Sequence, residues 1–351
     1  MGNRVTVQDI ADELGLSRNT VSKALNNTEG IAEDTRQRVL DKAVELGYKQ
    51  FAYAKSVVEA HILEPPTSIP DGQPREISLL TRAQWDGRHF AALMLDSFKR
   101  EITQMGYTFA SYYVSDRRAE ALELPRDFDL SRTCAIMCIE MFDYTYDEMV
   151  CGLGKPVLFV DCPARLSGNV LPADLLLMDN YTALQSIVST MLAQGINKVG
   201  FIGDCLHCES FLERYVAVES AIHLAGHTFD RKYYIGYNEL DKIRAGLTRM
   251  HDEHDMPELF VCANDFVAVN VLSSLRDLRL RVPDDVMIIG FDDAPGARTC
   301  MPPLTTVHIH TQIMAYSAAQ LIVSRLKEPD LDFRQVSTQT DLIIRASTMR
   351  R

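Results

Sequence analysis

The chain has 351 residues, a formal net charge of −12 at pH 7 and 46% hydrophobic residues. This length exceeds one typical domain, so a small domain followed by a larger core is a sensible division. No apolar run approaches the ~20 residues of a membrane span, and the polar N-terminus lacks the apolar region of a signal peptide. We therefore expect a cytoplasmic protein that does not bind a membrane, which argues against a periplasmic binding protein.

The N-terminal segment predicts two short helices joined by a tight turn. Apolar residues recur at i, i+3, i+4 and i+7 within 7–14, and Thr6 is placed to cap that helix. Gly15 breaks the pattern, and Ser17 can cap a second helix at 18–26. Two helices connected in this way form a helix-turn-helix, whose second helix can enter the major groove of DNA.

The polarity of the second helix sharpens this interpretation. Polar residues surround a thin apolar seam on it: Arg18, Asn19, Thr20, Ser22, Lys23 and Asn26. Arginine can hold the edge of guanine and asparagine that of adenine, each worth roughly 1–3 kcal/mol of discrimination. A solvated polar helix face is the alternative for this segment alone. A third helix at 33–46, with Gly47 at its end, supplies the remaining wall of a small core.

The charge of this region is close to neutral. Residues 1–60 hold eight Lys or Arg and nine Asp or Glu, a net charge of −1. DNA binding must therefore depend on the local placement of cations and of backbone N–H groups at helix starts. We expect the DNA affinity of each such N-terminal domain to depend only modestly on salt concentration.

The remainder of the chain alternates strands with helices after a proline-rich linker at 61–74. Helical stretches such as 89–105 and 181–194 lie between apolar strands, which indicates parallel sheets covered on both faces. The strand candidates are 77–80, 109–114, 134–139, 157–160, 199–202, 259–262 and 286–291.

Several motifs occur in an order that resembles the lactose-repressor (LacI/GalR) family nearly end to end. In the N-terminal segment these are Val5-Thr6-Val7-Gln8-Asp9-Ile10-Ala11, Ser17-Arg18-Asn19-Thr20-Val21-Ser22-Lys23-Ala24-Leu25-Asn26 and Leu46-Gly47-Tyr48. Farther along they are Ala263-Asn264-Asp265, Ile288-Ile289-Gly290-Phe291-Asp292-Asp293, Pro303-Leu304-Thr305-Thr306-Val307 and Ile344-Arg345-Ala346-Ser347.

The resemblance implies an all-α helix-turn-helix headpiece plus an α/β core of two doubly wound parallel-sheet lobes, like periplasmic binding proteins. The expected limits are a headpiece at 1–48, a hinge helix and linker at 49–75, and an effector-binding and dimerisation core at 76–351. Within that core, lobe 1 takes about 76–177 and 308–336, and lobe 2 takes about 178–306 and 337–351. The chain is expected to cross between lobes near 177–179, 306–308 and 336–338.

The family also implies a DNA-contact set. Arg18 and Asn19 are expected to read bases, and hydroxyl and amide side chains to hold phosphates. The complete set in the headpiece is Thr6, Val7, Ser17, Arg18, Asn19, Thr20, Ser22, Lys23 and Asn26.

The hinge departs from the family, in which a leucine wedge kinks the operator from the minor groove. Val57 falls at the leucine position with Ala54 on the same face, and Phe51 stands where an asparagine is usual. Valine is shorter and β-branched, so we expect a weaker or differently bending hinge. The alternative is that Phe51 or Val58 serves as the wedge.

Effectors of doubly wound folds bind outside the carboxyl ends of the strands, here in a cleft between the lobes. Family motifs point to Asp161, Arg214, Asn264, Asp265 and Asp292 as effector residues. An arginine fork beside carboxylates suits the hydroxyls of a sugar or nucleoside. Helix capping or turn bonding is the alternative for the three aspartates.

Two further features concern the ligand. Trp85, the only tryptophan, follows the first core strand and is placed to stack on a sugar face, with a surface or packing role as the alternative. After Val307 the family tends to continue with a glutamine, whereas this chain has His308 and His310, which leaves room for a different ligand.

Other chemistry-bearing clusters are weaker. Cys205-Leu206-His207-Cys208 has the spacing of a metal or redox motif, but no second ligand pair completes a tetrahedral zinc site. We interpret that segment as a loop of the effector cleft. The His and acidic residues at 251–255 are interpreted as an exposed helix end, and His308 and His310 as residues that do not chelate a metal. We predict no metal and no cofactor, and no nucleophile elbow, P-loop or dinucleotide fingerprint is present.

The sequence therefore predicts a ligand-responsive transcriptional regulator and not an enzyme. We expect a repressor that binds a palindromic double-stranded operator as a homodimer, with a sugar-like or nucleoside-like effector. The alternatives are a sugar-binding module with lost or weakened DNA regulation and, less favoured, an enzyme acting in the cleft.

Overall fold

A computed structural model of the chain describes residues 6–25, 31–46, 73–83, 90–166, 168 and 170–350. The chain divides into two compact units, Met1–Ile69 and Pro70–Arg351. The finer division into headpiece, linker and core at residues 48 and 76 stays a prediction.

The first unit contains three helices, α1 (Val7–Leu14), α2 (Arg18–Leu25) and α3 (Glu33–Glu45). All three contribute fully buried side chains to one small core: Ile10, Ala11, Val21, Ala24, Val39 and Ala43. The three helices expected from periodicity are confirmed, and each buries the apolar face that the sequence pattern indicates.

The turn between α1 and α2 is defined by local bonds. The Thr6 hydroxyl accepts from the Asp9 amide at 3.3 Å, and the Asp9 carboxylate accepts from the Thr6 amide at 2.7 Å. This reciprocal pair satisfies N–H groups that have no partner within the helix. Gly15 ends α1 at a φ of +64°, a left-handed conformation that glycine adopts without strain.

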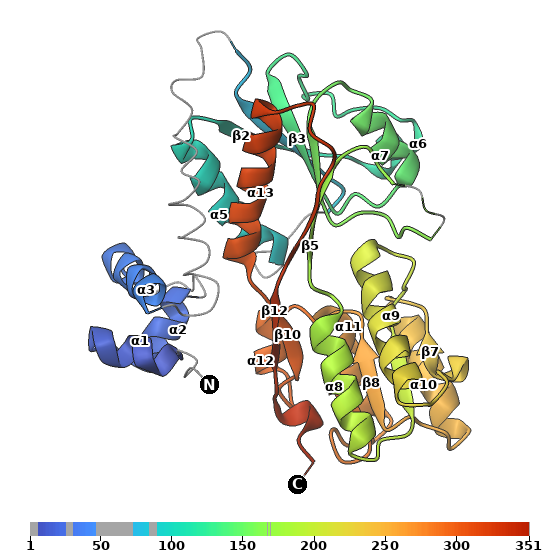
Figure 1. Cartoon of the computed structure of the whole chain (residues 1–351). Coiled ribbons are helices and arrows are strands. Elements are labelled where there is room, and N and C mark those ends of the chain that lie inside the picture. The colour runs from blue at the N-terminus through green and yellow to red at the C-terminus, as the bar shows by residue number, and fades with distance from the viewer. Residues whose placement is uncertain are drawn as a thin grey trace. The chain divides into compact units, whose positions relative to one another are not determined.

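The first lobe of the second unit is built on six parallel strands in the order β11-β5-β4-β3-β1-β2. Four helices cover the two faces of this sheet (Figure 1). The strands are β1 (Glu76–Thr81), β2 (Thr108–Tyr113), β3 (Thr133–Ile139), β4 (Val157–Val160), β5 (Asp174–Met178) and β11 (Gln335–Thr338), and the helices are α5 (Phe90–Gln104), α6 (Asp116–Glu120), α7 (Tyr144–Cys151) and α13 (Thr311–Lys327).

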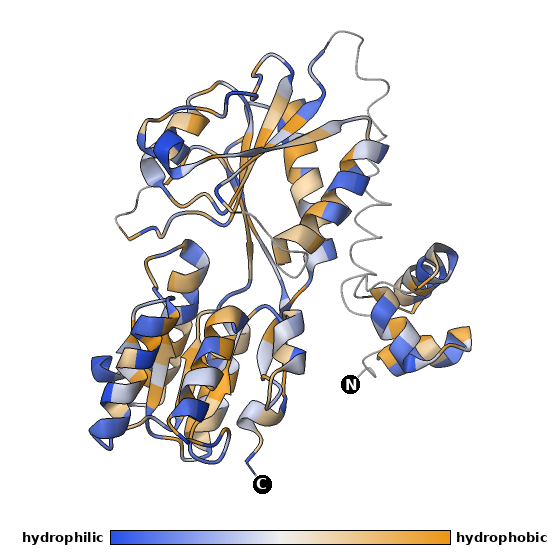
Figure 2. Cartoon of the chain, turned by 180° about the vertical axis from the view of Figure 1, so that it is seen from behind, coloured by the Kyte–Doolittle hydropathy of each residue, from blue (hydrophilic) through white to orange (hydrophobic). Residues whose placement is uncertain are grey.

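The second lobe is built on four parallel strands in the order β7-β6-β8-β9. Figure 2 shows apolar strands enclosed by helices whose outer faces are polar, the pattern of a sheet covered on both sides. The strands are β6 (Val199–Ile202), β7 (Tyr234–Ile235), β8 (Leu259–Cys262) and β9 (Met287–Ile289), and the helices are α8 (Thr182–Ala193), α9 (Glu209–Leu224), α10 (Leu240–Asp252), α11 (Asp265–Asp277) and α12 (Pro295–Thr299), with short 3₁₀ turns η1 (Arg231–Tyr233) and η2 (Ala346–Thr348).

An antiparallel pair, β10 (Thr306–Ile309) with β12 (Thr340–Ile343), lies where the chain passes between the lobes. The chain leaves the six-stranded sheet after β5, returns to it through β10 and α13, and leaves it again between β11 and β12. The two-lobed α/β core expected from the family resemblance is thus confirmed. No helix among the described residues is long and apolar enough to cross a bilayer.

The strand order of both sheets indicates where a ligand binds. In each, the first strand lies between the second and the third, so the chain winds in opposite directions from that point. Doubly wound sheets bind ligands outside the carboxyl ends of the strands at such a switch point. The switch points lie between β1 and β3 in the first lobe and between β6 and β8 in the second.

Candidate functional site

The first candidate surface is the polar face of α2. Val21 and Ala24 are fully buried in the headpiece core, whereas Arg18, Asn19 and Lys23 are exposed. Thr20 and Ser22 are half-buried beside them. One eight-residue helix therefore presents a cation, an amide and a second cation on the side opposite its apolar seam, which is the arrangement of a recognition helix.

The hydroxyl groups expected to hold phosphates also have local partners. The Ser17 hydroxyl accepts from the Thr20 amide at 3.0 Å and lies 2.8 Å from the Thr20 hydroxyl. Thr6 forms the capping pair with Asp9, and Val7 is half-buried in the first turn of α1. These bonds give Thr6, Ser17 and Thr20 structural roles, and their contact with phosphate stays a prediction.

Five predicted site residues fall outside the described part of the chain. They are Asn26 at the end of the second helix, Phe51, Ala54 and Val57 in the hinge, and Trp85 after the first core strand. Their proposed roles stay predictions.

The second candidate site collects polar residues from the strand ends of both lobes. Glu140 follows β3, Asp161 follows β4 and Asp292 comes shortly after β9, while Arg214 lies in α9. We call these four residues the interlobe cluster. Asp161 and Asp292 act electrostatically on Glu140, and Arg214 acts on Asp161 and Asp292. Residues separated by up to 152 positions, from Glu140 to Asp292, therefore meet at the strand ends where the fold predicts a ligand.

Arg214 is fixed by bonds from several directions. Its side chain is 3% exposed; Nε donates to the Asn180 amide oxygen at 2.9 Å, and Nη1 donates to the Ala263 carbonyl at 2.7 Å. Nη1 also lies 3.7 Å from Oδ1 of Asp292, an ion pair rather than a hydrogen bond. The guanidinium packs over the Phe291 ring at 3.6 Å from its centroid. A guanidinium held this rigidly presents its charge to a bound molecule at little entropic cost.

The carboxylates of the interlobe cluster lie at strained backbone positions and have raised pKa values. Glu140, Asp161 and Asp292 all have positive φ angles, of 57°, 64° and 112°. Left-handed non-glycine residues cost energy and gather at functional sites. Burial raises the pKa of Glu140 to about 7, with a further contribution from Asp161 and Asp292. Burial also raises the pKa of Asp292 to about 6, although Arg214 lowers it.

Asp161 joins the two lobes. Its Oδ1 accepts from the Cys162 amide at 2.8 Å and from the Ser210 amide, in the first turn of α9, at 3.1 Å. A carboxylate at a helix N-terminus satisfies free N–H groups and complements the helix dipole. Burial raises the pKa of Asp161 despite these bonds. A first-lobe side chain therefore caps the second-lobe helix that carries Arg214.

Asn264 and Asp265 have internal roles. Asn264 caps α11 by accepting from the Val267 amide at 2.9 Å. The buried Asp265 carboxylate accepts from the Thr306 hydroxyl at 2.7 Å and from the Ala294 amide at 2.8 Å. A Cβ at Gly290 would lie 2.1 Å from Oδ1 of Asp265, so glycine is required there. These bonds account for both residues without a ligand, and their effector contact stays a prediction.

The lobes also meet beside the interlobe cluster. The Arg165 amide donates to Oε2 of Glu209 at 2.8 Å, and Nη2 of Arg165 donates to Oε1 of Glu209 at 2.9 Å. The Glu209 amide donates back to the Cys162 carbonyl at 2.8 Å. Phe142 of the first lobe contacts the His207 ring edge to face at 5.0 Å between centroids. We call the Arg165–Glu209–Cys162 contacts the interlobe latch.

The histidine and cysteine motifs bring together no metal site. Among the described residues, no group of three or more His, Cys, Asp or Glu side chains is arranged to hold a metal ion. All eight cysteines are free thiols. His308 bonds to Asp293 at 3.1 Å and His310 pairs with Asp341 at 3.3 Å. His310 comes one residue after the end of β10, and its ring contacts that of His308 edge to face at 5.1 Å between centroids.

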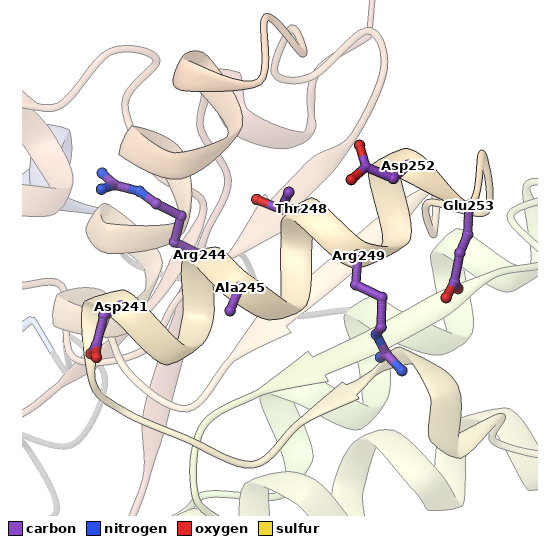
Figure 3. A pocket seen from close by; sticks show the side chains of 7 residues that line it. All are labelled: Asp241, Arg244, Ala245, Thr248, Arg249, Asp252 and Glu253. Carbon is purple, nitrogen blue, oxygen red and sulfur yellow. The ribbon is translucent and has the colours of Figure 1, made fainter.

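A hollow lies elsewhere, along the outer face of α10. It has a volume of about 660 Å³ and is lined by residues of that one helix and its end. Figure 3 shows the seven side chains, charged except for Ala245 and Thr248, on a single stretch of helix. No strand end contributes to it, so it is a solvent-facing surface and not the site that the sheet topology predicts.

Sequence reasoning missed Glu140 and Asn180. The Asn180 side chain is 1% exposed; it accepts from Arg214, and it donates to the Met178 carbonyl at 3.0 Å and to Glu213 at 2.8 Å. Both residues come directly after an apolar strand, or within two positions of one, where a ligand site of this fold is expected. Asking which polar residue follows each predicted strand would have identified Glu140, whereas Asn180 follows β5, which the strand predictions did not include.

Two family models match the chain in the expected order. The model of bacterial regulatory proteins of the lacI family matches residues 6–50, and a periplasmic binding protein-like domain matches residues 188–348. The chain is 27% identical over 365 residues to the HTH-type transcriptional regulator GalR of Lacticaseibacillus casei, covering 98% of this chain and 99% of that protein. It is 25% identical over 351 residues to the HTH-type transcriptional repressor PurR of Haemophilus influenzae, covering 97% and 98%.

Solved structures support the fold. A complex of the transcriptional regulator CelR with cellobiose has a TM-score of 0.67 at 20% identity and covers 98% of this chain and 100% of that one. The lac repressor dimer bound to operator and the anti-inducer ONPF has a TM-score of 0.66 at 18% identity, covering 99% and 100%. With a lacI-type DNA-binding domain over residues 6–50, a periplasmic binding protein-like domain over residues 188–348 and similarity over nearly its whole length to HTH-type regulators, the chain is similar to bacterial transcriptional regulators of the lacI family.

Proposed function

We propose that this protein is a cytoplasmic, ligand-responsive repressor that binds a palindromic operator as a homodimer. The observation that carries the proposal is α2, which buries Val21 and Ala24 while exposing Arg18, Asn19 and Lys23. In this proposal Arg18 and Asn19 contact base edges, and Lys23 with the hydroxyls of Thr6, Ser17, Thr20 and Ser22 contacts phosphates. Two copies of one helix reading two half-sites require a two-fold operator.

The proposed effector is a small molecule rich in hydroxyl groups, of the sugar or nucleoside class, bound at the interlobe cluster. The carboxylates of Glu140, Asp161 and Asp292 supply acceptors for hydroxyl groups, and Arg214 supplies a fixed positive charge. Three acidic side chains beside one arginine disfavour an anionic ligand such as a sugar phosphate, because the carboxylates would repel it. The cellobiose held by the structural neighbour CelR supports the sugar class.

Effector and operator binding are coupled through lobe closure in this proposal. A molecule bonded to Asp161 and Glu140 on one side and to Arg214 and Asp292 on the other binds the closed lobes more tightly than the open ones. The coupling free energy is of the usual size, about 1–3 kcal/mol, which corresponds to a change in operator affinity of roughly 5- to 150-fold.

The experiment is selection of genome fragments by the purified full-length protein, with and without a panel of neutral sugars, sugar phosphates and nucleosides. We expect recovery of one palindromic sequence, with a yield that changes for a neutral hydroxyl-rich compound and not for its phosphorylated form. The direction of that change gives the sign of regulation. Recovery of no preferred sequence under any condition would instead favour the sugar-binding module without regulated DNA binding.

Matched variants separate the two halves of the proposal. Arg18→Ala is expected to change which base is preferred at one operator position and to leave the effector response intact. Asp292→Asn is expected to weaken the effector response and to leave the recovered sequence unchanged. Arg244→Ala, an exposed arginine on α10, serves as the control for both. Loss of sequence preference in Asp292→Asn would contradict this division of roles.

A further inference from the structure

A second, smaller cavity lies within the first lobe. Its volume is about 90 Å³, and its wall comes from the start of α7, from β4 and the loop after it, and from β5 and β11. Most of the wall is apolar or aromatic, including Tyr144, Phe159, Ala173, Leu175 and Phe333. One water needs about 10–15 Å³ of such space, and an apolar cavity of about 150 Å³ holds benzene. The cavity therefore has room for a molecule of about the size of a five-membered ring.

One buried polar atom in the wall has no hydrogen-bond partner among the described residues. Asp174 is 2% exposed and accepts from Arg325 Nη2 at 2.8 Å and from Arg334 Nη2 at 2.9 Å. Arg165 donates from Nη1 to the Gln335 side chain and from Nη2 to Glu209, each at 2.9 Å. Its Nε is buried, and no acceptor in the described part of the chain bonds to it. A buried N–H without an acceptor is costly, so this atom favours a ligand that brings one.

We propose that this cavity is a second ligand site for a small uncharged molecule with an apolar body and one oxygen acceptor, such as a short ketone or lactone. The carbonyl oxygen accepts from Nε of Arg165, and the ring or chain packs against Phe159, Leu175 and Phe333. A carboxylate ligand fits less well, because Glu209 already pairs with Arg165, Glu213 acts on it as a second negative charge, and Asp174 lies in the wall.

The cavity is connected to the interlobe latch through one side chain. Arg165 lines the cavity and holds Glu209, the first residue of α9, with both its backbone amide and its guanidinium. The same helix carries Arg214 of the interlobe cluster. A molecule that fixes the Arg165 side chain therefore stabilises the contact between the lobes. Coupling of this kind is reciprocal, so an effector that closes the lobes also strengthens binding in the cavity.

The first test uses methyl-labelled full-length protein and cyclopentanone as the probe, with cyclopentene as the analogue that lacks the acceptor. We expect cyclopentanone to shift the methyl signals of Ala173 and Leu175 but not that of Leu247, in the core of the other lobe. One net hydrogen bond predicts about five- to tenfold tighter binding of the ketone than of the hydrocarbon. Equal affinities for the two probes would overturn the proposal. It would also be overturned if neither probe shifts the lining methyl signals, because the cavity would then hold only water.

Two variants check the location. Ala173→Leu fills the cavity and is expected to abolish the shifts, while Ala121→Leu, at an exposed position of the same lobe, is expected to keep them. Arg165→Lys removes Nε. In this variant we expect the ketone and the hydrocarbon to bind with about equal affinity. If Ala173→Leu does not fold, Ala173→Val and Arg165→Lys still test whether the probe binds in this cavity. Undiminished ketone preference in Arg165→Lys contradicts the proposed acceptor contact.

The coupling to the latch has its own measurement. The amides of Glu209 and Ser210 donate to Cys162 and Asp161 in the other lobe, so their hydrogen exchange reports lobe contact. Saturating cyclopentanone is expected to slow exchange at these two amides several-fold and to leave that of α10 unchanged. Unchanged exchange at Glu209 and Ser210 with the cavity occupied would refute the coupling. Failure of the operator experiment above affects neither readout, because both are measured without DNA.

Discussion

The recognition surface of α2 and the interlobe cluster present functional side chains in opposite ways. Arg18, Asn19 and Lys23 are exposed, and all three lie on one helix of eight residues. Arg214 and Asp161 are 3% and 7% exposed, and they lie on segments that are distant in the chain, in α9 and directly after β4. The exposed groups exchange water for a partner on binding. The buried groups already bond within the protein, so a ligand there competes with the bonds that hold the lobes together.

This contrast separates the consequences of substitution. A change in α2 affects what the protein binds and leaves most of its stability unchanged, because the side chains lie outside the headpiece core. A change in the interlobe cluster affects stability and binding together, because each side chain serves both. Substitutions in the two regions test that separation.

Arg214→Ala is expected to destabilise the second unit by about 3–5 kcal/mol, the usual cost of removing one partner from a buried ion pair. It leaves the Asn180 amide oxygen and the Ala263 carbonyl without their donor, and the Asp292 carboxylate without its ion-pair partner. Urea unfolding of the full chain measures the loss. Arg244→Ala breaks an exposed ion pair with Asp277 and is expected to cost less than about 1 kcal/mol. Similar losses in the two variants would mean that the buried contacts of Arg214 contribute no more to stability than an exposed ion pair does.

Asp147 adds a third kind of side chain, buried but without a partner. It is fully buried in α7, and neither carboxylate oxygen has a hydrogen-bond partner in the described chain. Burial raises its pKa to about 8, with a further contribution from Asp143. The unfolded chain releases this proton near pH 4, whereas the folded chain keeps it to about pH 8. Stability contributed by this group therefore falls as the pH rises through that window, by on the order of 5 kcal/mol.

Asp147→Asn is expected to remove most of that decline, because the amide does not ionise. The free energy of unfolding, measured between pH 5 and pH 8, checks the slope rather than the absolute stability. Asp174 is the natural contrast: burial acts to raise its pKa, but hydrogen bonds from Arg325 and Arg334 lower it below its usual value. Its contribution is complete above pH 4 and lost only as the pH falls through that lower pKa. An unchanged slope in Asp147→Asn would show that Asp147 gains a partner in solution.

These carboxylates also mark where sequence reasoning succeeds. Helices and strands with regular apolar spacing, such as α1, α5 and β3, were predictable because each buries a face defined by its own residues. β5 was not among the predicted strands, and it begins at Asp174, a charged residue that is buried in the fold. Its partners Arg325 and Arg334 lie 151 and 160 residues farther along the chain. No local pattern shows that such a charge will be neutralised.

The candidate sites divide in the same way. The α2 surface was predictable because its residues are adjacent in sequence and share one helix. Arg214, Asp161 and Asp292 were identified by family motifs, whereas Asn180 and Glu140 were not. Asn180 acquires its role only when β5 and α9 bring Met178, Glu213 and Arg214 around it. Contacts of that kind depend on tertiary packing and not on spacing.

Arg18→Ala is expected to change binding without changing the stability of the fold. If Arg18 grips a guanine, its loss lowers discrimination at one operator position by about 1–3 kcal/mol. Affinities for all single-base variants of the selected operator measure this. Lys23→Ala, a proposed phosphate contact, is expected to weaken every operator variant equally and to reduce the salt slope by about one. If Arg18→Ala keeps the parent's preferences at every position, its base-reading role is wrong.

Thr6→Ala is expected to have the smallest effect, about 1 kcal/mol, and only on the headpiece. It removes the hydroxyl that accepts from the Asp9 amide and also bonds to the Asp9 carboxylate at 2.8 Å, which opens one side of the capping pair. Hydrogen exchange of the α1 amides in the full chain detects this loss locally. Gln8→Ala removes an exposed side-chain bond to Asp12 on the same helix and is expected to cost less than about 0.5 kcal/mol. Faster exchange in the second unit after Thr6→Ala would break the comparison, because a headpiece cap would then contribute to the stability of the core.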